Sequence, residues 1–244
     1  MSFSNLICIV GTDTSIGKTI IGSSICSFIR SYGFSVGVFK PAETGCLSDK
    51  GILPQDGLLL KEAASSPDPI ETIVPYRLCK PLSPAEASKI DGVTISKNSI
   101  LEILPKMTAS YDFVLMEGAG GLLVPFSSNL LFADILEAFF ANVLVVGRST
   151  LGTVNHTLLT LSELDRRKIN TLGFILNRLT ENFSLEEKSN PSSISQYTPH
   201  TFFGVFPFVP VSCRHDFDYL SSSLKKSADP LLLSILLKMA GSKN

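Results

Sequence analysis

The chain has 244 residues, of which 44% are hydrophobic and 18% are charged, and its formal net charge is −1. This composition excludes a disordered protein, and the near-neutral charge argues against a nucleic-acid-binding or membrane-surface protein. Five scattered cysteines exclude a disulfide framework or a zinc site, while the lack of a signal peptide and of any run of ~20 apolar residues predicts a cytoplasmic protein.

Short apolar runs alternate with helical patterns along the whole chain. The runs contain mainly Val, Ile, Leu and Phe without polar alternation, which is typical of strands buried on both faces. In chain order they are Leu6–Val10, Ser35–Phe39, Phe113–Met116, Val143–Val146, Leu172–Leu176 and Phe202–Phe206. Between them, apolar residues recur at helical spacing, as at Ile21, Ile25 and Phe28. We expect an α/β fold in one domain, residues 1–244, with a doubly wound, mainly parallel sheet and helices on both faces.

Three long connections interrupt this alternation. Residues 41–56 follow a predicted strand, and residues 65–85 contain five prolines. Long connections in a compact domain are usually functional or disordered. Residues 180–200 are polar and are predicted to form an exposed, mobile surface insert.

The stretch GTDTSIGKT, from Gly11 to Thr19, lies between the first predicted strand and a predicted helix. A phosphate-binding loop needs inward backbone N–H groups, a lysine for the terminal phosphates and a hydroxyl for Mg²⁺ at a helix N-terminus. Lys18 and Thr19 supply the last two. The usual spacing would put a glycine at position 12, where this chain has threonine. A simple turn with an exposed lysine is the weaker alternative, so we expect a nucleoside triphosphate site.

Lys40 and Pro41 close the second predicted strand. Residues just beyond the carboxyl ends of parallel strands face the ligand crevice, and Pro41 restricts Lys40 to extended geometry. Lys40 could therefore stabilise charge on a phosphoryl group in transfer. An exposed surface lysine is the alternative.

Two carboxylates are candidates for a metal site. Asp56 could be a helix N-cap or a magnesium ligand, and as an isolated residue it favours the cap. Glu117 comes directly after a buried strand and before a glycine-rich turn that would allow backbone to approach a substrate closely. Together with Thr19, these carboxylates would form an oxygen-rich set suited to Mg²⁺.

Weaker signals follow two later strands. Ser149 to Thr153 precede a helical pattern, so the free N–H groups there could bind a phosphate or a carboxylate, although simple capping explains part of this pattern. Asn177 ends a predicted strand and carries both a donor and an acceptor, which suits an adenine edge. The run at residues 204–210 offers an apolar wall nearby.

With these residues identified, the chain resembles the dethiobiotin synthetase family. The resemblance runs from Val10 to about Asn177, with a weaker continuation to Pro210. It rests on GTDTSIGKT, KPAETG, PYRLCKPLSPAEAS, MEGAGGLLVPF, LGTVNHTLLT and FILN. It implies a phosphate-loop NTPase fold and an ATP- and Mg²⁺-dependent ring closure of 7,8-diaminononanoate with CO₂ or bicarbonate. The reaction would pass through a carbamate and a carbamic-phosphoric anhydride and give dethiobiotin, ADP and phosphate.

The resemblance also implies roles for individual residues. Lys18 and Lys40 would be catalytic, and Thr19, Asp56 and Glu117 would bind the metal. The implied ATP-binding residues are Ser15, Ile16, Gly17, Lys18, Thr19, Ile20, Asp56, Glu117, Gly118, Ala119, Gly120, Asn177, Arg178 and Pro207. The implied substrate-binding residues are Thr14, Thr44, Gly152, Thr153, Val154 and Asn155. The last four would cap the substrate carboxylate of the neighbouring subunit in a homodimer.

Three positions depart from the family pattern. Ser15 stands where the family often has glutamate, Ala85 where a histidine usually follows Ser-Pro, and Arg178 where an acidic residue is common. The alternatives are an amidoligase or a partitioning-type ATPase with the same loop, and a non-catalytic nucleotide-binding protein. Partitioning ATPases carry a second lysine at the position of Asp13, which argues against them. Lys40 and Glu117 argue against a non-catalytic nucleotide-binding protein, because only phosphoryl chemistry requires these two residues.

Overall fold

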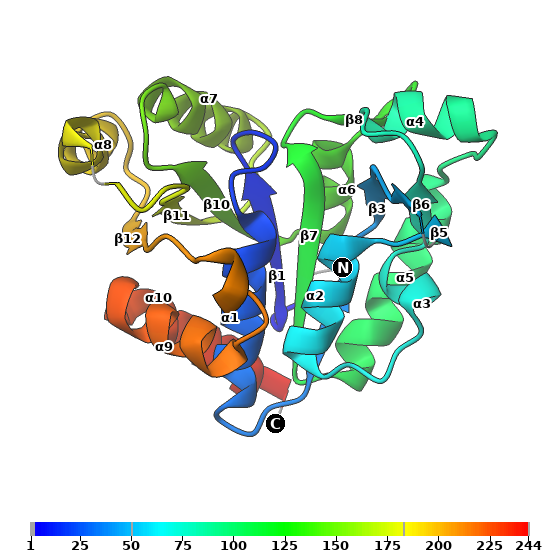
Figure 1. Ribbon diagram of the computed structural model, residues 1–244, viewed down its shortest axis with the longest axis horizontal. Helices are drawn as coiled ribbons and strands as arrows, with labels where there is room; N and C mark the ends of the chain where they lie inside the picture. The colour runs from blue at the N-terminus through cyan, green and yellow to red at the C-terminus, as the bar shows by residue number, and fades with distance from the viewer. Residues whose placement is uncertain (1–2, 50, 183, 244) are drawn as a thin grey trace.

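The computed structural model describes residues 3–49, 51–182 and 184–243, and its centre is a six-stranded sheet (Figure 1). The strand order is β12-β11-β10-β1-β7-β2, and every neighbouring pair is parallel. The strands are β1 (Leu6–Gly11), β2 (Val36–Phe39), β7 (Phe113–Gly121), β10 (Asn142–Arg148), β11 (Thr171–Asn177) and β12 (Phe202–Phe206). All six predicted apolar runs are confirmed as strands of this sheet.

The predicted long connections contain short strands of their own. β3 (Ala42–Thr44) pairs in parallel with β6 (Tyr76–Leu78), and β4 (Leu47–Ser48) pairs with β5 (Gly51–Ile52) in a small antiparallel ribbon. A second ribbon, β8 (Pro125–Ser127) with β9 (Leu130–Leu131), follows β7. These additions lie on the β7 side of β1, away from β11 and β12 (Figure 1).

Helices cover both faces of the sheet because each strand sends alternate apolar side chains to opposite sides. Ile7 and Ile9 belong to one buried core, whereas Leu6 and Cys8 belong to the other. The first core is covered by α1 (Lys18–Arg30), α2 (Gln55–Ala64), α9 (Phe217–Ser227) and α10 (Pro230–Ala240). The second is covered by α5 (Lys97–Ser110), α6 (Phe132–Phe139), α7 (Thr153–Arg166) and α8 (Leu185–Ser195). The doubly wound α/β prediction is confirmed.

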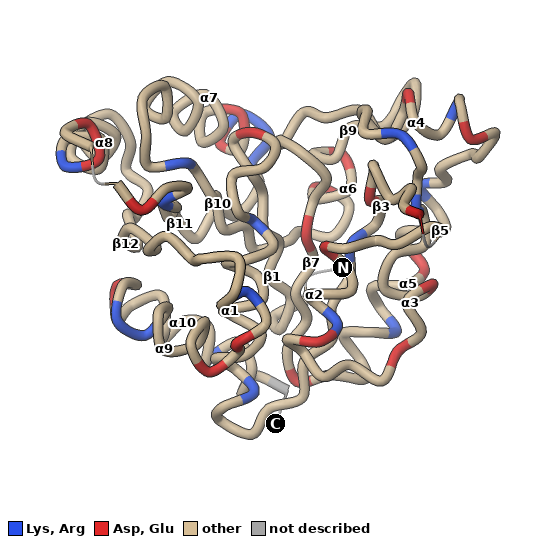
Figure 2. Tube along the Cα trace, viewed as in Figure 1, with Lys and Arg blue, Asp and Glu red and all other residues tan. Residues whose placement is uncertain are grey.

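The remaining elements are short. They are α3 (Ile70–Ile73), α4 (Pro84–Asp91), η1 (Val211–Cys213) and η2 (Gly241–Lys243). No helix in the described ranges is long and apolar enough to cross a membrane. The five cysteines are all free thiols, in agreement with the sequence prediction. Basic and acidic residues are interspersed over the molecule (Figure 2).

The exposed insert predicted at residues 180–200 contains α8, and most residues of this helix are exposed or partly exposed while three are buried. Ile194 on this helix is buried in the second core, which also contains Leu6 and Cys8. Glu187 and Asn190 are buried as well. Asn190 Nδ2 donates to the Ser149 carbonyl at 2.7 Å, and the Ser149 hydroxyl donates to the Glu187 carboxylate. The polar residues that suggested exposure are thus satisfied by distant partners. The mobility of this segment stays a prediction.

Candidate active site

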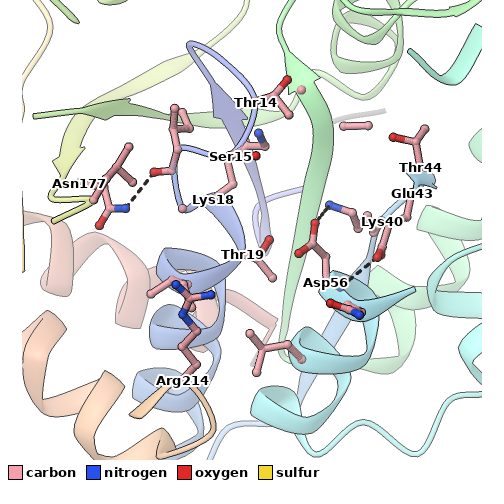
Figure 3. Close-up of a pocket in the computed structure, with 18 of the residues that line it drawn as sticks. Thr14, Ser15, Lys18, Thr19, Lys40, Glu43, Thr44, Asp56, Asn177 and Arg214 are labelled. Atoms are coloured by element: carbon pink, nitrogen blue, oxygen red, sulfur yellow. Dashed lines mark hydrogen bonds and ion pairs between the residues drawn. The ribbon is translucent and has the colours of Figure 1, made fainter. Parts of the chain in front are cut away.

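A cavity of about 990 Å³ opens at the carboxyl ends of the central strands. Its walls come from the β1–α1 loop, the segment after β2, the first turn of α2, the end of β11 and the loop after β12 (Figure 3). This is the edge at which open parallel sheets bind ligands. The segments that line it are far apart in the sequence and meet because parallel strands all end on the same side.

The β1–α1 loop has the features that a phosphate-binding loop requires. α1 begins at Lys18, and Gly17 before it has φ 88°, a left-handed conformation that favours glycine. Lys18 is buried, and its Nζ donates to the Asp13 carbonyl oxygen at 3.1 Å. Burial lowers the pKa of Lys18 to about 8, although Glu117 opposes that shift. Bound phosphate would favour the charged form of this lysine.

Asn177 fixes this loop from the end of β11. Its Nδ2 donates to the Ile16 carbonyl at 2.8 Å, and Asn177 itself is buried (Figure 3). A Cβ on Gly17 would lie only 2.1 Å from that nitrogen, so the close approach requires glycine. The side-chain nitrogen of Asn177 therefore holds the phosphate-binding loop, and the amide oxygen is the acceptor that suits a nucleotide base.

Beside the loop, charged residues from three elements form a cluster. Lys40 Nζ lies 2.5 Å from Glu117 Oε1 and 3.1 Å from Asp56 Oδ2. The Thr19 hydroxyl donates to the same Glu117 oxygen at 2.9 Å. The sheet register explains the first contact, because Phe39 pairs with Met116 and the next residue on each strand is Lys40 or Glu117.

The electrostatics of the cluster keep Lys40 charged. Burial alone would lower the pKa of Lys40, but the carboxylates of Glu117, Asp56 and Glu43 together raise it above its usual range. Burial would likewise raise the pKa of Asp56, yet Lys40 holds it below its ordinary value. A permanent cation thus stands next to the phosphate-binding loop.

The two predicted metal-binding carboxylates, Glu117 and Asp56, differ in how far their side chains are exposed to solvent. The Glu117 side chain is fully buried, and its Oε2 has no hydrogen-bond partner among the described residues. Asp56 is half exposed and lies in the first turn of α2, whose N-cap residue is Pro54. The N-cap alternative for Asp56 is therefore wrong.

Most predicted site residues line the cavity, and a few do not. Those that line it are Thr14, Ser15, Ile16, Gly17, Lys18, Thr19, Ile20, Lys40, Thr44, Asp56, Ala119, Gly120, Asn177 and Arg178. Those outside the lining are Glu117, Gly118, Gly152, Thr153, Val154, Asn155 and Pro207. Glu117 reaches the site through its contacts with Lys40 and Thr19. Gly118 is packed on Phe132, whose ring would lie 2.4 Å from a Cβ at that position.

Sequence reasoning missed several lining residues. Glu43 contributes a carboxylate from β3, and Arg214 lines the cavity from the loop after η1 (Figure 3). Phe208 and Val209, rather than Pro207, form the apolar wall after β12. The KPAETG motif contained the signal for Glu43, because this carboxylate lies three residues beyond Lys40 on the site edge.

The start of α7 lies outside this cavity. Gly152 is its N-cap with φ 90°, and Arg148 nearby contacts His156 at 3.3 Å and Asp13 at 3.8 Å. Two large apolar side chains are exposed here, Leu151 at 79% and Leu159 at 62%. The predicted carboxylate-binding segment thus adjoins an exposed apolar surface.

Comparisons with known proteins identify a family that matches most of this chain and relatives that are similar to it in sequence. Residues 5–215 match the family described as AAA domain. The chain is 39% identical over 212 residues to the ATP-dependent dethiobiotin synthetase of Thermodesulfovibrio yellowstonii, covering 82% of this chain and 88% of that one. It is 32% identical over 200 residues to the enzyme of the same name from Bacillus licheniformis, covering 82% and 84%.

Solved structures share the fold at low sequence identity. The septum site-determining protein MinD of Pyrococcus horikoshii, complexed with Mg-ADP, aligns with a TM-score of 0.56 at 14% identity, covering 100% of this chain and 96% of that one. The MinC:MinD cell division complex of Aquifex aeolicus aligns with a TM-score of 0.54 at 13% identity, covering 98% and 95%. At this identity the likeness supports the fold alone.

The lowered pKa of Lys18 makes a prediction about proton uptake. Free Lys18 titrates near pH 8, and a bound triphosphate favours its charged form, so ATP binding between about pH 8 and pH 10 takes up a proton. The affinity for ATP is therefore expected to fall as the pH rises through about 8. Titration calorimetry in buffers of different ionisation enthalpy measures the uptake. Lys18→Arg, which stays charged in this range, removes it. Equal heats in all buffers for the unmodified protein contradict the prediction.

Proposed function

The chain belongs to the family of ATP-dependent dethiobiotin synthetases, and from that premise we propose that it closes the ring of 7,8-diaminononanoate with CO₂ at the expense of ATP. It is accordingly an ATP-dependent ligase. The observation that best supports the proposed reaction is the cluster at the strand ends. Two buried lysines, Lys18 and Lys40, lie there beside two carboxylates and a hydroxyl. Phosphoryl transfer needs such a concentration of positive charge at a phosphate site.

The proposed chemistry runs in three steps. One amine of the substrate attacks CO₂ and loses a proton, which forms a carbamate. A carbamate oxygen attacks the γ-phosphorus of ATP, the bond to ADP breaks, and a carbamic-phosphoric anhydride results. The second amine attacks the carbamate carbon, phosphate leaves, and a proton is released as the cyclic urea forms.

Each lysine has a distinct part in this proposal. Lys18, at the start of α1, would stabilise the terminal phosphates of ATP. Lys40 would stabilise charge that develops on the transferring phosphoryl group and on the carbamate, because the surrounding carboxylates keep it protonated. Thr14 and Thr44 line the cavity and carry hydroxyls suited to the diamine or its carbamate.

The residues present also fit Mg²⁺. Thr19, Asp56 and Glu117 offer hard oxygen donors, and Glu117 Oε2 is a buried acceptor with no described partner. No group of three or more His, Cys, Asp or Glu side chains that could hold a metal occurs among the described residues, so ATP and water would complete the shell. The bound ion would neutralise charge on the phosphates.

The nucleotide base would lie at the β11 side of the cavity. The Asn177 amide oxygen would accept from an exocyclic amine, and Phe208 and Val209 offer an apolar surface. Arg178 lines the same region.

We place the substrate carboxylate at the start of α7 of a second subunit. The N–H groups at Gly152–Asn155 suit an anion, and they do not line this chain's own cavity. Leu151 and Leu159, both exposed, would be covered in a homodimer.

The reaction itself is the first test. Purified protein with ATP, Mg²⁺, ¹³C-bicarbonate and 7,8-diaminononanoate is expected to give dethiobiotin whose urea carbon carries the label. Mass spectrometry of the product measures this, and omission of each component in turn is the control. ATP binding without labelled product contradicts the proposed reaction.

Replacing Lys40 separates binding from turnover. Lys40→Gln is expected to lower kcat by roughly 10²–10³-fold, because a charge aimed at the transition state is lost. The Kd for ATP should change by less than about threefold, since Lys18 remains. Steady-state kinetics and fluorescence titration measure the two quantities. Lys89→Gln, on an exposed helix, is the control. An equal loss in kcat and in ATP affinity contradicts the assigned role.

Disrupting the α7 surface tests the shared site. Leu159→Glu is expected to give a monomer with a KM for the diamine raised roughly tenfold, because the carboxylate loses charge-assisted hydrogen bonds. The KM for ATP should stay unchanged. Analytical ultracentrifugation establishes the oligomeric state before the kinetics. Leu231→Glu, at another exposed leucine, is the matched control. Unchanged diamine kinetics in a verified monomer contradict a site shared between subunits.

A further inference from the structure

The first turn of α2 is held by a carboxylate from another element. Pro54 is the N-cap residue and makes no side-chain hydrogen bond, so the helix does not cap itself. Instead, Glu43 Oε1 accepts from the Asp56 N–H at 3.0 Å and Glu43 Oε2 accepts from the Gly57 N–H at 2.9 Å. Figure 3 shows the Glu43 side chain pointing at this turn. The carboxylate also complements the positive end of the helix.

Glu43 and the first turn of α2 pack closely against each other. Glu43 is only 6% exposed, so its carboxyl group is buried against the helix. A Cβ on Gly57 would lie 2.2 Å from Val74 Cγ2 and 3.4 Å from Glu43 Oε2. Glycine at this position therefore allows the helix to pack against Val74, with the Glu43 carboxyl group in contact with the same turn.

Asp56, whose backbone N–H donates to Glu43, also supplies a side chain to the charge cluster. Asp56 Oδ2 lies 3.1 Å from Lys40 Nζ. Burial raises the pKa of Glu43 to about 7, although Lys40 opposes that shift. Glu43 thus contacts the backbone of Asp56, one partner of the Lys40–Asp56 ion pair. Its carboxylate oxygens contact the backbone, so its action on that pair is indirect.

We propose that Glu43 is a positioning residue, which anchors the first turn of α2 and thereby holds Asp56 against Lys40 and within the metal-binding set. This inference rests on the proposed function for its effect on turnover. Its structural part, the anchoring of the helix, is independent of the reaction. Without Glu43, two backbone N–H groups in a partly buried turn lose their acceptor. The Asp56 side chain would then no longer be fixed.

Hydrogen exchange tests the anchoring without reference to any activity. In Glu43→Ala, the amides of Asp56 and Gly57 are expected to exchange at least roughly tenfold faster than in the unmodified protein. Glu43→Gln keeps one acceptor oxygen and should restore part of the protection. Glu86→Ala removes a carboxylate from the first turn of α4, which Ser83 caps, and should leave α2 unchanged. Unaltered exchange at Asp56 and Gly57 in Glu43→Ala overturns the proposal.

A double-mutant cycle tests whether Glu43 acts through Asp56. Glu43→Ala is expected to lower kcat roughly tenfold and to raise the Mg²⁺ concentration for half-maximal activity, with Glu43→Gln intermediate. In the Asp56→Ala background, Glu43→Ala should have no further effect. A full additional loss in that background, or an unchanged kcat despite faster exchange, overturns the positioning role.

The two proposals fail in different ways. If the unmodified protein makes no dethiobiotin, the proposed function fails, and the Mg²⁺ dependence of ATP binding replaces kcat as the readout for Glu43. A weaker Mg²⁺ dependence of ATP binding in Glu43→Ala than in the unmodified protein then supports the positioning role. In the Asp56→Ala background, Glu43→Ala should cause no further change in that dependence. An identical Mg²⁺ dependence in Glu43→Ala and the unmodified protein overturns it.

Discussion

The buried contact between Lys40 and Glu117 determines where the other parts of the site can lie. The parallel register of β2 and β7 places Lys40, just after the end of β2, opposite Glu117 in the middle of β7, with 3% and 0% of their side chains exposed. Neither charge is stable alone at that depth, because removing one partner leaves an uncompensated ion. Thr19 joins the pair from α1, and Asp56 joins it from α2. The site is therefore one connected set of charged and polar groups, in which Glu117 and Asp56 keep Lys40 protonated.

Much of this arrangement can be predicted from the sequence. The central strands are buried on both faces, and continuous apolar runs such as Leu6–Val10 and Val143–Val146 are a strong signal for that environment. Once the strands are parallel, the residues that follow them must meet at one edge. This reasoning alone brings Lys18, Lys40 and Glu117 together, without any knowledge of their contacts.

What the sequence did not reveal depends on contacts between distant segments. Glu43 caps a helix that begins after Pro54, whereas local cap rules consider only the residues next to a helix. α8 contains Pro191 and many polar residues, so its burial depends on partners such as Ser149, which the local pattern does not show. The glycine-rich stretch after Glu117 was predicted as a turn, but residues 118–121 continue β7; Gly118 accommodates the ring of Phe132, and Gly120 lines the cavity.

The contact between Asn177 and the phosphate-binding loop restricts how the two positions can diverge between descendants of this chain. Any side chain at residue 17 would occupy the space of the Asn177 amide, and the left-handed backbone there adds a further penalty. A shorter residue at 177 would make room but would leave the Ile16 carbonyl without its donor. Neither change is tolerated by itself. Residues 17 and 177, although distant in the sequence, are expected to be inherited as a pair.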